Sequence, residues 1–140
     1  MEHVFDEKTT LRELFRVIRP GGCLVVMSPN RWFPFEGHGA HIGEFKLAFP
    51  VPFLPWLPAK LGQRFMEARN YWPRELRDLV KSVGFNIQTV DFVLPVLENY
   101  KWLPAWAIPR YQSIIPVLER TPFFRRFGVS VFIAARKPPG

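Results

Sequence analysis

The three histidines of this 140-residue chain are the side chains best suited to proton transfer or metal binding. His3 stands directly beside Glu2 and is a candidate base toward a bound molecule, although a polar residue here can also simply cap the next helix. His38 and His41 are close enough to suggest a metal pair, but a third ligand with suitable context is not evident. We therefore predict no metal site and expect both histidines to contribute to a substrate pocket.

Asn30 and Trp32 are the other candidates for substrate contact, because they come after a run of apolar residues typical of a buried strand. Ligands of open α/β folds bind beyond the carboxyl ends of the strands. The Asn30 amide could hydrogen-bond a ligand at this edge, and a plain turn is the equal alternative. Trp32 opens an aromatic-rich segment whose rings could enclose a substrate, with ordinary packing as the alternative.

A helix, a glycine turn and a strand are expected to position these candidates. Thr10 and Glu13 form a capping box, so the helix should begin near Leu11. Its apolar stripe has the spacing i, i+3, i+4, i+7 and consists of Leu11, Leu14, Phe15 and Ile18. The Pro-Gly-Gly sequence at 20–22 ends this helix, and the unbroken apolar run at 23–27 predicts a parallel strand covered by helices on both faces.

A second helix and two further strands are predicted later in the chain. Pro73 suits the first helical position, and the same apolar spacing recurs before Gly84 at Leu76, Leu79, Val80 and Val83. Strands are expected at 87–94, with a change of register or a bulge at 88–89, and at 129–136. Together these elements predict a single α/β domain over 1–140.

Two long intervals, about 31–72 and 95–128, interrupt this pattern and hold most of the prolines and aromatic residues. Loops of this length inside a compact domain are uncommon and are often functional. We interpret both intervals as lid-like insertions, with short helices at 59–68 and 111–119. Their aromatic side chains are expected either to enclose a substrate, to contact a membrane surface, or simply to pack.

The charge of the chain favours acidic partners, since the formal net charge is +7 and the isoelectric point is about 10.1. From Lys101 onward the basic residues greatly outnumber the single acidic residue, Glu119, and they are interleaved with aromatic residues. This pattern resembles an interfacial surface that rests on anionic lipid, and a solvated basic face is the alternative. No nucleic-acid-binding motif accompanies the charge, so nucleic acid is not an expected partner.

The compartment is inferred from what the sequence lacks. The first residues are acidic and include no secretory signal, and no apolar stretch reaches the roughly 20 residues that a membrane span needs. The single cysteine, Cys23, rules out an intrachain disulfide and fits a reducing compartment. We expect a cytoplasmic protein that can lie at the periphery of a membrane.

Four segments, in this order and spacing, resemble the class I S-adenosylmethionine-dependent methyltransferases. They are Glu2-His3-Val4, the helix, turn and strand at 11–26, the helix from Pro73 through Gly84-Phe85, and the closing strand from Val131 to Lys137. The resemblance implies a Rossmann-like sheet whose final strand is antiparallel, and S-adenosylmethionine as the cofactor. It also implies that Glu2 and His3 lie near the methionine end of that cofactor, at the carboxyl edge of the sheet. The implied acceptor is small and apolar or amphipathic.

The chain departs from this family in lacking the glycine-rich loop after the first strand and the acidic residue after the second. By the resemblance, it begins where the fourth strand of a complete enzyme ends. We therefore expect the carboxyl-terminal half of an enzyme with an incomplete cofactor site, from a truncated, split or mis-started reading frame. The alternative function is a non-catalytic module that binds a membrane surface or a partner. An exposed sheet edge would favour such association.

Overall fold

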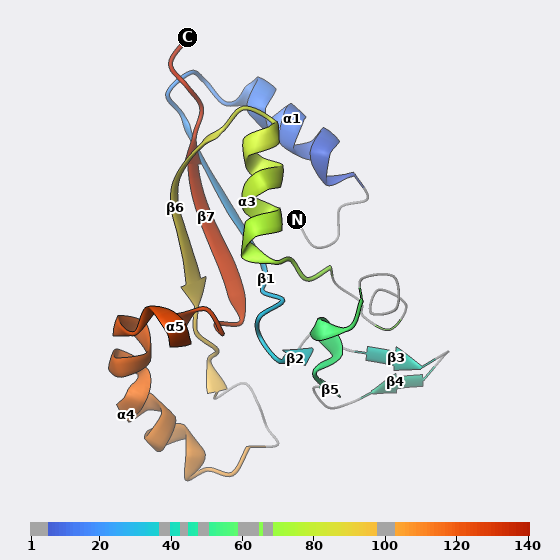
Figure 1. Cartoon of the computed structure of the whole chain (residues 1–140), viewed down its shortest axis with the longest axis vertical. Coiled ribbons are helices and arrows are strands. Elements are labelled where there is room, and N and C mark those ends of the chain that lie inside the picture. Colours follow the sequence, from blue (N-terminus) through green and yellow to red (C-terminus); the bar gives the residue numbers. More distant parts are fainter. Residues whose placement is uncertain are drawn as a thin grey trace.

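A three-stranded sheet is the centre of the fold (Figure 1). The computed structural model describes residues 6–36, 40–42, 45–47, 51–58, 65, 69–97 and 103–140. The strands β1 (Cys23–Pro29), β6 (Asn86–Val93) and β7 (Ser130–Arg136) lie in the order β1-β7-β6. The middle strand β7 is antiparallel to both neighbours, so β1 and β6 point the same way and their carboxyl ends share one edge.

The first helix, α1 (Glu7–Val17), begins earlier than the sequence predicted. Asp6 is its N-cap, and the Asp6 carboxylate accepts hydrogen bonds from the Thr9 backbone at 2.9 Å and the Thr9 hydroxyl at 2.6 Å. These bonds hold the pKa of the Asp6 carboxyl below its usual value. Thr10 already lies inside the first turn, so the predicted start near Leu11 is wrong. An aspartate three residues before a threonine supplies a cap one turn earlier.

The core lies between the sheet and the two helices α1 and α3 (Pro73–Ser82). The apolar stripes predicted for both helices are confirmed, because their side chains are buried or packed against the core. The strands contribute alternate residues from the same face. The buried residues of this cluster are Leu11, Leu24, Val26, Tyr71, Leu76, Val80, Phe85, Val131, Ile133 and Ala135.

The strand β1 is covered on one face and exposed on the other. Leu24 and Val26 are buried, whereas Val25 is 60% exposed and Met27 is 53% exposed. Within the described residues β1 pairs only with the antiparallel β7, apart from one parallel bridge between Asn30 and Tyr71. The expectation of a parallel strand covered on both faces is therefore wrong for the described part of the chain, and the outer edge of β1 stays open.

The ends of the two helices are joined by aromatic packing. Gly84 adopts a φ of 110°, where a side chain would be strained and its Cβ would lie 3.2 Å from the Phe15 ring. The turn brings Phe85 against Phe15 with ring centroids 4.9 Å apart. Lys137 closes the same end, because its ammonium donates to the carbonyls of Phe15 and Ile18 at the end of α1.

The predicted strands at 87–94 and 129–136 are confirmed to within one residue, as β6 and β7. The predicted irregularity at 88–89 is present as a shift in register between Ile87 and Thr89. Ala134 and Ala135 lie opposite residues of both neighbouring strands.

The first insertion contains short paired strands rather than only loop. The outer pair is β2 (Phe35–Glu36) with β5 (Val51–Pro52), and the inner pair is β3 (Ala40–Ile42) with β4 (Phe45–Leu47). A 3-10 turn, η1 (Leu54–Trp56), comes next. The helix predicted at 59–68 falls almost wholly outside the described residues.

The second insertion contains the helices α4 (Ala107–Arg120) and α5 (Pro122–Arg125), which lie beyond the carboxyl end of β6 (Figure 1). The helix predicted at 111–119 is therefore confirmed, and it starts four residues earlier than expected. Across the described ranges, no helix has both the length and the apolar content to cross a bilayer.

Candidate functional site

An open groove with a volume of about 610 Å³ lies at the sheet edge where β1 and β6 end. Its walls come from the segment after β1, the start of α3, the end of β6 and the residue after α5. This is the edge at which open α/β folds bind their ligands. The side chains that define the groove are Trp32, Trp72, Arg74, Asp78, Phe92 and Arg126.

Two tryptophans form the apolar wall of the groove. The ring centroids of Trp32 and Trp72 are 5.2 Å apart, in an edge-to-face contact. The guanidinium carbon of Arg31 lies 5.1 Å from the centre of the Trp72 ring. Arg31 also donates to the carbonyl of Pro55 at 2.7 Å, so the first insertion is tied to the groove wall. The wall is thus held by contacts between the start of the first insertion, at Arg31, and its end, at Trp72.

Hydrogen bonds of the Asn30 side chain hold this wall in position. Its amide nitrogen donates to the carbonyls of Arg126 and Gly128, both at 2.7 Å, and its amide oxygen accepts from the Trp32 backbone at 3.1 Å. The side chain is 2% exposed. Both amide hydrogens are used within the protein, so Asn30 has no donor left for a substrate. The turn role that was the alternative for Asn30 accounts for this geometry.

The backbone at Gly128 approaches β6 closely. A Cβ on Gly128 would lie 2.6 Å from the Val93 carbonyl oxygen, closer than such atoms are found. Only glycine therefore fits between the end of β6 and the start of β7. Together Asn30 and Gly128 hold three chain segments at one edge, although they are 98 residues apart.

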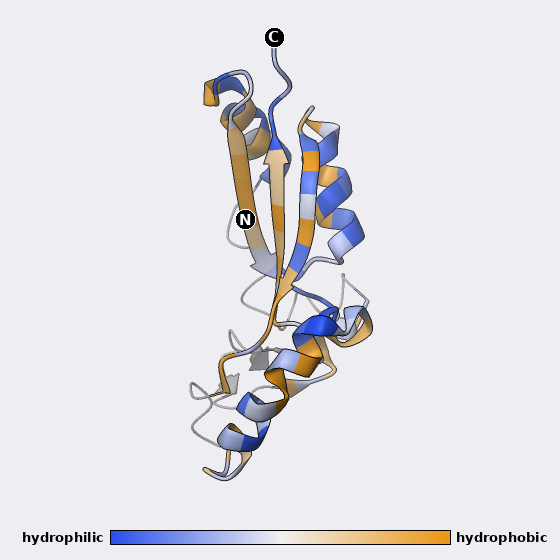
Figure 2. Ribbon diagram, turned by 90° about the vertical axis from the view of Figure 1, so that its left-hand side faces the viewer, coloured by the Kyte–Doolittle hydropathy of each residue, from blue (hydrophilic) through white to orange (hydrophobic). Residues whose placement is uncertain are grey.

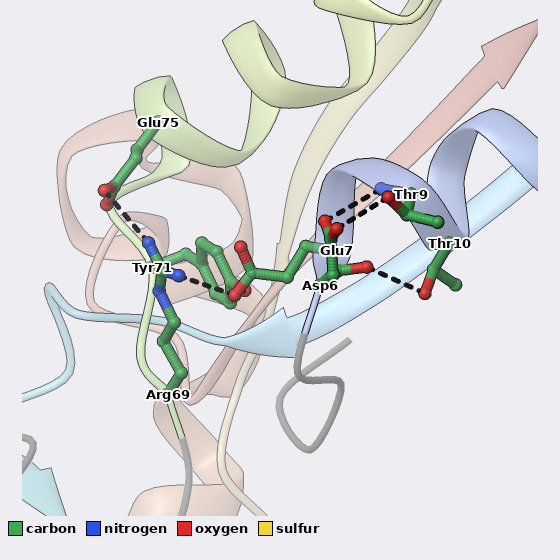
Figure 3. A network of polar contacts seen from close by, with 7 residues as sticks. All are labelled: Asp6, Glu7, Thr9, Thr10, Arg69, Tyr71 and Glu75. Carbon is green, nitrogen blue, oxygen red and sulfur yellow. Dashed lines mark hydrogen bonds and ion pairs between the residues drawn. The ribbon is translucent and has the colours of Figure 1, made fainter.

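A partly buried ionic network anchors the segment that leads into α3 (Figure 3). The Tyr71 hydroxyl donates to Glu7, and the Arg69 guanidinium donates to the same carboxylate oxygen at 2.6 Å. Arg69 also lies 3.7 Å from Glu75 at the start of α3. Burial, and then the bond to Glu7, raise the pKa of the Tyr71 phenol far above its usual value.

Of this network only Glu75 lines the groove, and the other members position the groove without lining it. The backbone of Tyr71 pairs with the end of β1, through bonds to Pro29 at 3.0 Å and from Arg31 at 2.9 Å. The next residue, Trp72, therefore emerges at the groove. The start of α1 and the start of α3 are locked to the same point through Glu7.

The carboxylates of the groove are neutralised by arginines. Asp78 lies 3.9 Å from Arg74 and 3.2 Å from Arg77, and Glu75 lies 3.7 Å from Arg69. Trp72 is the N-cap residue of α3 and makes no side-chain hydrogen bond there, because a tryptophan side chain offers no acceptor to the backbone amides. The groove is therefore an apolar cleft with a paired, charged rim.

The site residues predicted from the sequence do not all meet at the groove. Trp32 lines the groove and Asn30 supports it. The backbone of His41 pairs with Lys46 between β3 and β4, and its side chain is not described. Glu2, His3 and His38 lie outside the described residues. In the part of the chain that the structure describes, no three metal-ligating side chains gather.

Several groove residues were missed by sequence reasoning, namely Trp72, Arg74, Asp78, Phe92 and Arg126. The first three could have been found from the sequence. They lie at or near the start of α3, which follows the first insertion, and the start of this helix lies at the same sheet edge as the end of β1. Nothing in the spacing connects Phe92 or Arg126 with Trp32. Their meeting depends on the pairing of β6 with β7.

The fold is a mixed α/β arrangement consistent with part of a Rossmann-like methyltransferase sheet. It is similar to the solved structure of an S-adenosylmethionine-dependent methyltransferase from Mesorhizobium loti, with a TM-score of 0.54 and 14% sequence identity. The match covers 97% of this chain and 57% of that one, so the chain spans little more than half the length of its structural neighbour. No protein-family model matches the sequence, and neither does any curated protein. At this identity the likeness establishes the fold.

Proposed function

We propose that this chain is the carboxyl-terminal, acceptor-binding part of an S-adenosylmethionine-dependent methyltransferase. The observation that carries the proposal is the similarity of 97% of the chain to part of such an enzyme, with 43% of that enzyme's length outside the match. One edge of β1 has no strand partner among the described residues, and this supports the proposal because a parallel strand from a preceding segment would pair there. The exposed outer face of β1, which includes Val25 and Met27, would be covered by a helix of the same segment.

The described residues do not form a site for the cofactor by themselves. The sequence contains no glycine-rich phosphate or nucleoside loop of the form G-x-G-x-G. The carboxylates of the groove, which would be candidates for binding ribose hydroxyls, already pair with arginines. We therefore assign no step of the reaction to the cofactor within these residues, and we place its site in the preceding segment together with Glu2 and His3.

The groove is suited to holding a methyl acceptor. Methyl transfer requires that the acceptor be aligned with the methyl group and shielded from water. Trp32, Trp72 and Phe92 offer rigid apolar surfaces for such alignment, and Arg126 at the rim can contact a polar end of the same molecule. These features favour a small acceptor that is apolar or amphipathic.

Calorimetric titration with S-adenosylmethionine tests the proposal. The chain is prepared alone and joined to an upstream segment that carries a glycine-rich loop. We expect binding by the joined protein and little or none by the chain alone. A joined protein that folds, as judged by circular dichroism, but does not bind the cofactor would contradict the proposal. Binding of equal strength by both would show that the cofactor site lies within these 140 residues.

The groove is tested separately in the joined protein. Trp32→Ala is expected to weaken binding of an apolar acceptor without changing the affinity for S-adenosylmethionine. Trp56→Ala is the matched control, since Trp56 is an exposed tryptophan of the same insertion and does not line the groove. Equal loss of acceptor binding in both variants would remove the groove from the proposal.

A further inference from the structure

The helix α4 exposes an apolar stripe on the side away from its half-buried residues Ile108, Tyr111, Ile115 and Leu118. At 100° per residue, Trp106, Ile114 and Val117 fall within about 80° of one another on its outer side. All three are exposed, and Val117 reaches 62%. The helix contains no buried residue. Figure 2 shows orange and blue residues alternating around this helix, away from the sheet.

Two aromatic residues of the neighbouring helix α5 add to the exposed apolar side chains of this region. Phe123 and Phe124 are both exposed, and their rings contact each other with centroids 5.5 Å apart. Phe123 contacts Phe127 at 5.6 Å, and Phe127 contacts Trp32 at 5.8 Å. A continuous row of rings therefore runs from the exposed end of α5 to the wall of the groove.

The charges on this face are positive. Arg110 lies within the same stripe as Trp106 and Val117, and Arg120 lies about 40° beyond its edge, whereas Glu119 lies on the opposite side of α4. The Arg110 guanidinium stacks over the Trp106 ring at 4.9 Å. Among the described residues from 103 to 127, Glu119 is the single acidic residue.

We propose that this face docks on an anionic membrane surface. The face is called the α4–α5 surface and comprises Trp106, Arg110, Ile114, Val117, Arg120, Phe123 and Phe124. Apolar side chains interleaved with arginines are the composition of a helix that lies in the headgroup region of anionic lipid. With 14 residues, α4 is about 21 Å long and cannot span a hydrocarbon core of about 30 Å. The docking does not depend on whether the chain transfers methyl groups.

Other occupants of this surface fit less well. Nucleic acid binds chiefly through its phosphates, and exposed aliphatic residues such as Ile114 and Val117 have no role in that contact. A second copy of the chain would bring the arginines of one α4–α5 surface against those of the other. An anionic lipid surface satisfies the arginines and the apolar side chains together.

Co-sedimentation of the full chain with vesicles tests the proposal. We expect binding to phosphatidylcholine vesicles that contain phosphatidylglycerol and little binding to phosphatidylcholine alone. The bound fraction should fall as salt is added, because screening weakens the attraction of exposed charges. Binding that is equal for both vesicle types, or that does not respond to salt, would overturn the proposal.

Two pairs of variants locate the contact. Val117→Ser with Phe124→Ser should weaken vesicle binding at least about tenfold, and Arg120→Glu should also weaken it about tenfold. The controls are Val17→Ser with Val25→Ser, which are equally exposed on the sheet body, and Arg12→Glu, which makes the same charge change on α1. Circular dichroism establishes that each variant is folded.

Three outcomes would contradict membrane docking at this surface. The first is equal loss of binding in the controls. The second is tighter, salt-dependent binding to duplex DNA that the Val117 and Phe124 substitutions leave unchanged. The third is a dimer, seen by light scattering without vesicles, that the same substitutions abolish. The first outcome removes this surface from membrane binding, and the other two assign it to a different partner.

Discussion

The sheet body and the α4–α5 surface use apolar residues in opposite ways. In the sheet body, formed by β1, β6, β7, α1 and α3, the apolar stripes of the helices close on the strands and several side chains have no exposed area. In α4 and α5 no side chain is buried, although aliphatic and aromatic residues are just as frequent. Apolar content by itself therefore does not distinguish a core from a contact surface, and the position of the stripe relative to the sheet does.

The largest expected difference between the two regions is in their response to truncation of an isoleucine. Ile133→Ala should lower the free energy of unfolding by about 2–5 kcal/mol, because Ile133 is fully buried in the middle strand. Ile114→Ala, on the exposed side of α4, should change it by less than about 0.5 kcal/mol. Urea unfolding followed by circular dichroism measures both. Similar losses would show that α4 belongs to the same core.

The next effect concerns the junction between the regions. Asn30→Ala should cost about 1–3 kcal/mol, because two buried carbonyls and one backbone amide lose their partner. Asn86→Ala, at an exposed position of β6, is the control. Tryptophan fluorescence should also shift in Asn30→Ala, since Trp32 is held by Asn30. An unchanged spectrum with full stability would mean that the groove wall is fixed by its ring contacts alone.

A smaller effect, with a characteristic pH dependence, is expected at Tyr71. Tyr71→Phe should lower stability at neutral pH by about 0.5–1.5 kcal/mol through loss of the bond to Glu7. The folded pKa of this phenol is raised above its ordinary value of 10.0, so its contribution is complete below that pH and is lost as the pH rises beyond it.

Thermal unfolding at a series of pH values measures this contribution. The wild-type protein should lose stability above pH 10, and Tyr71→Phe should lose less over the same range. Parallel pH profiles for the two proteins would contradict the buried phenol and carboxylate pair.

The smallest effect is expected on the α4–α5 surface itself. Val117→Ser should leave the free energy of unfolding within about 0.5 kcal/mol of the wild-type value, because the side chain has no buried contacts to lose. The same urea titration applies. A loss comparable to that of Ile133→Ala would place Val117 in an interface between elements of the chain.

The regular elements of the sheet body can be predicted from local sequence. Proline at the first position and an apolar repeat that ends before Gly84 were enough to place α3, and the runs at 87–94 and 129–136 were enough to place β6 and β7. The predicted start of α1 is wrong because two nearby residues can both cap a helix. Asp6 caps it one turn before Thr10. Both sites obey the same capping chemistry, and the spacing alone does not rank them.

The candidate site could be predicted only in part, because its contacts are long-range. Trp32 comes shortly after a predicted strand, so its place at the carboxyl edge was accessible from the sequence. The contact of Asn30 with Gly128 and the contact of Tyr71 with Glu7 join residues 98 and 64 positions apart. Neither contact produces a periodic pattern or a motif in the sequence. The burial of β1 was also misjudged, because an unbroken apolar run does not reveal which neighbours are present.

The position of β7 has a consequence for how the chain folds as it is synthesised. This strand lies between β1 and β6 in space but comes after both of them in the chain. Among the described strands of this sheet, β1 and β6 therefore have no hydrogen-bonding partner until β7 leaves the ribosome. Such a nascent chain exposes strand edges for most of its synthesis, a state that is slow to resolve and prone to aggregation. We therefore expect this three-stranded sheet to form only after β7 has been synthesised.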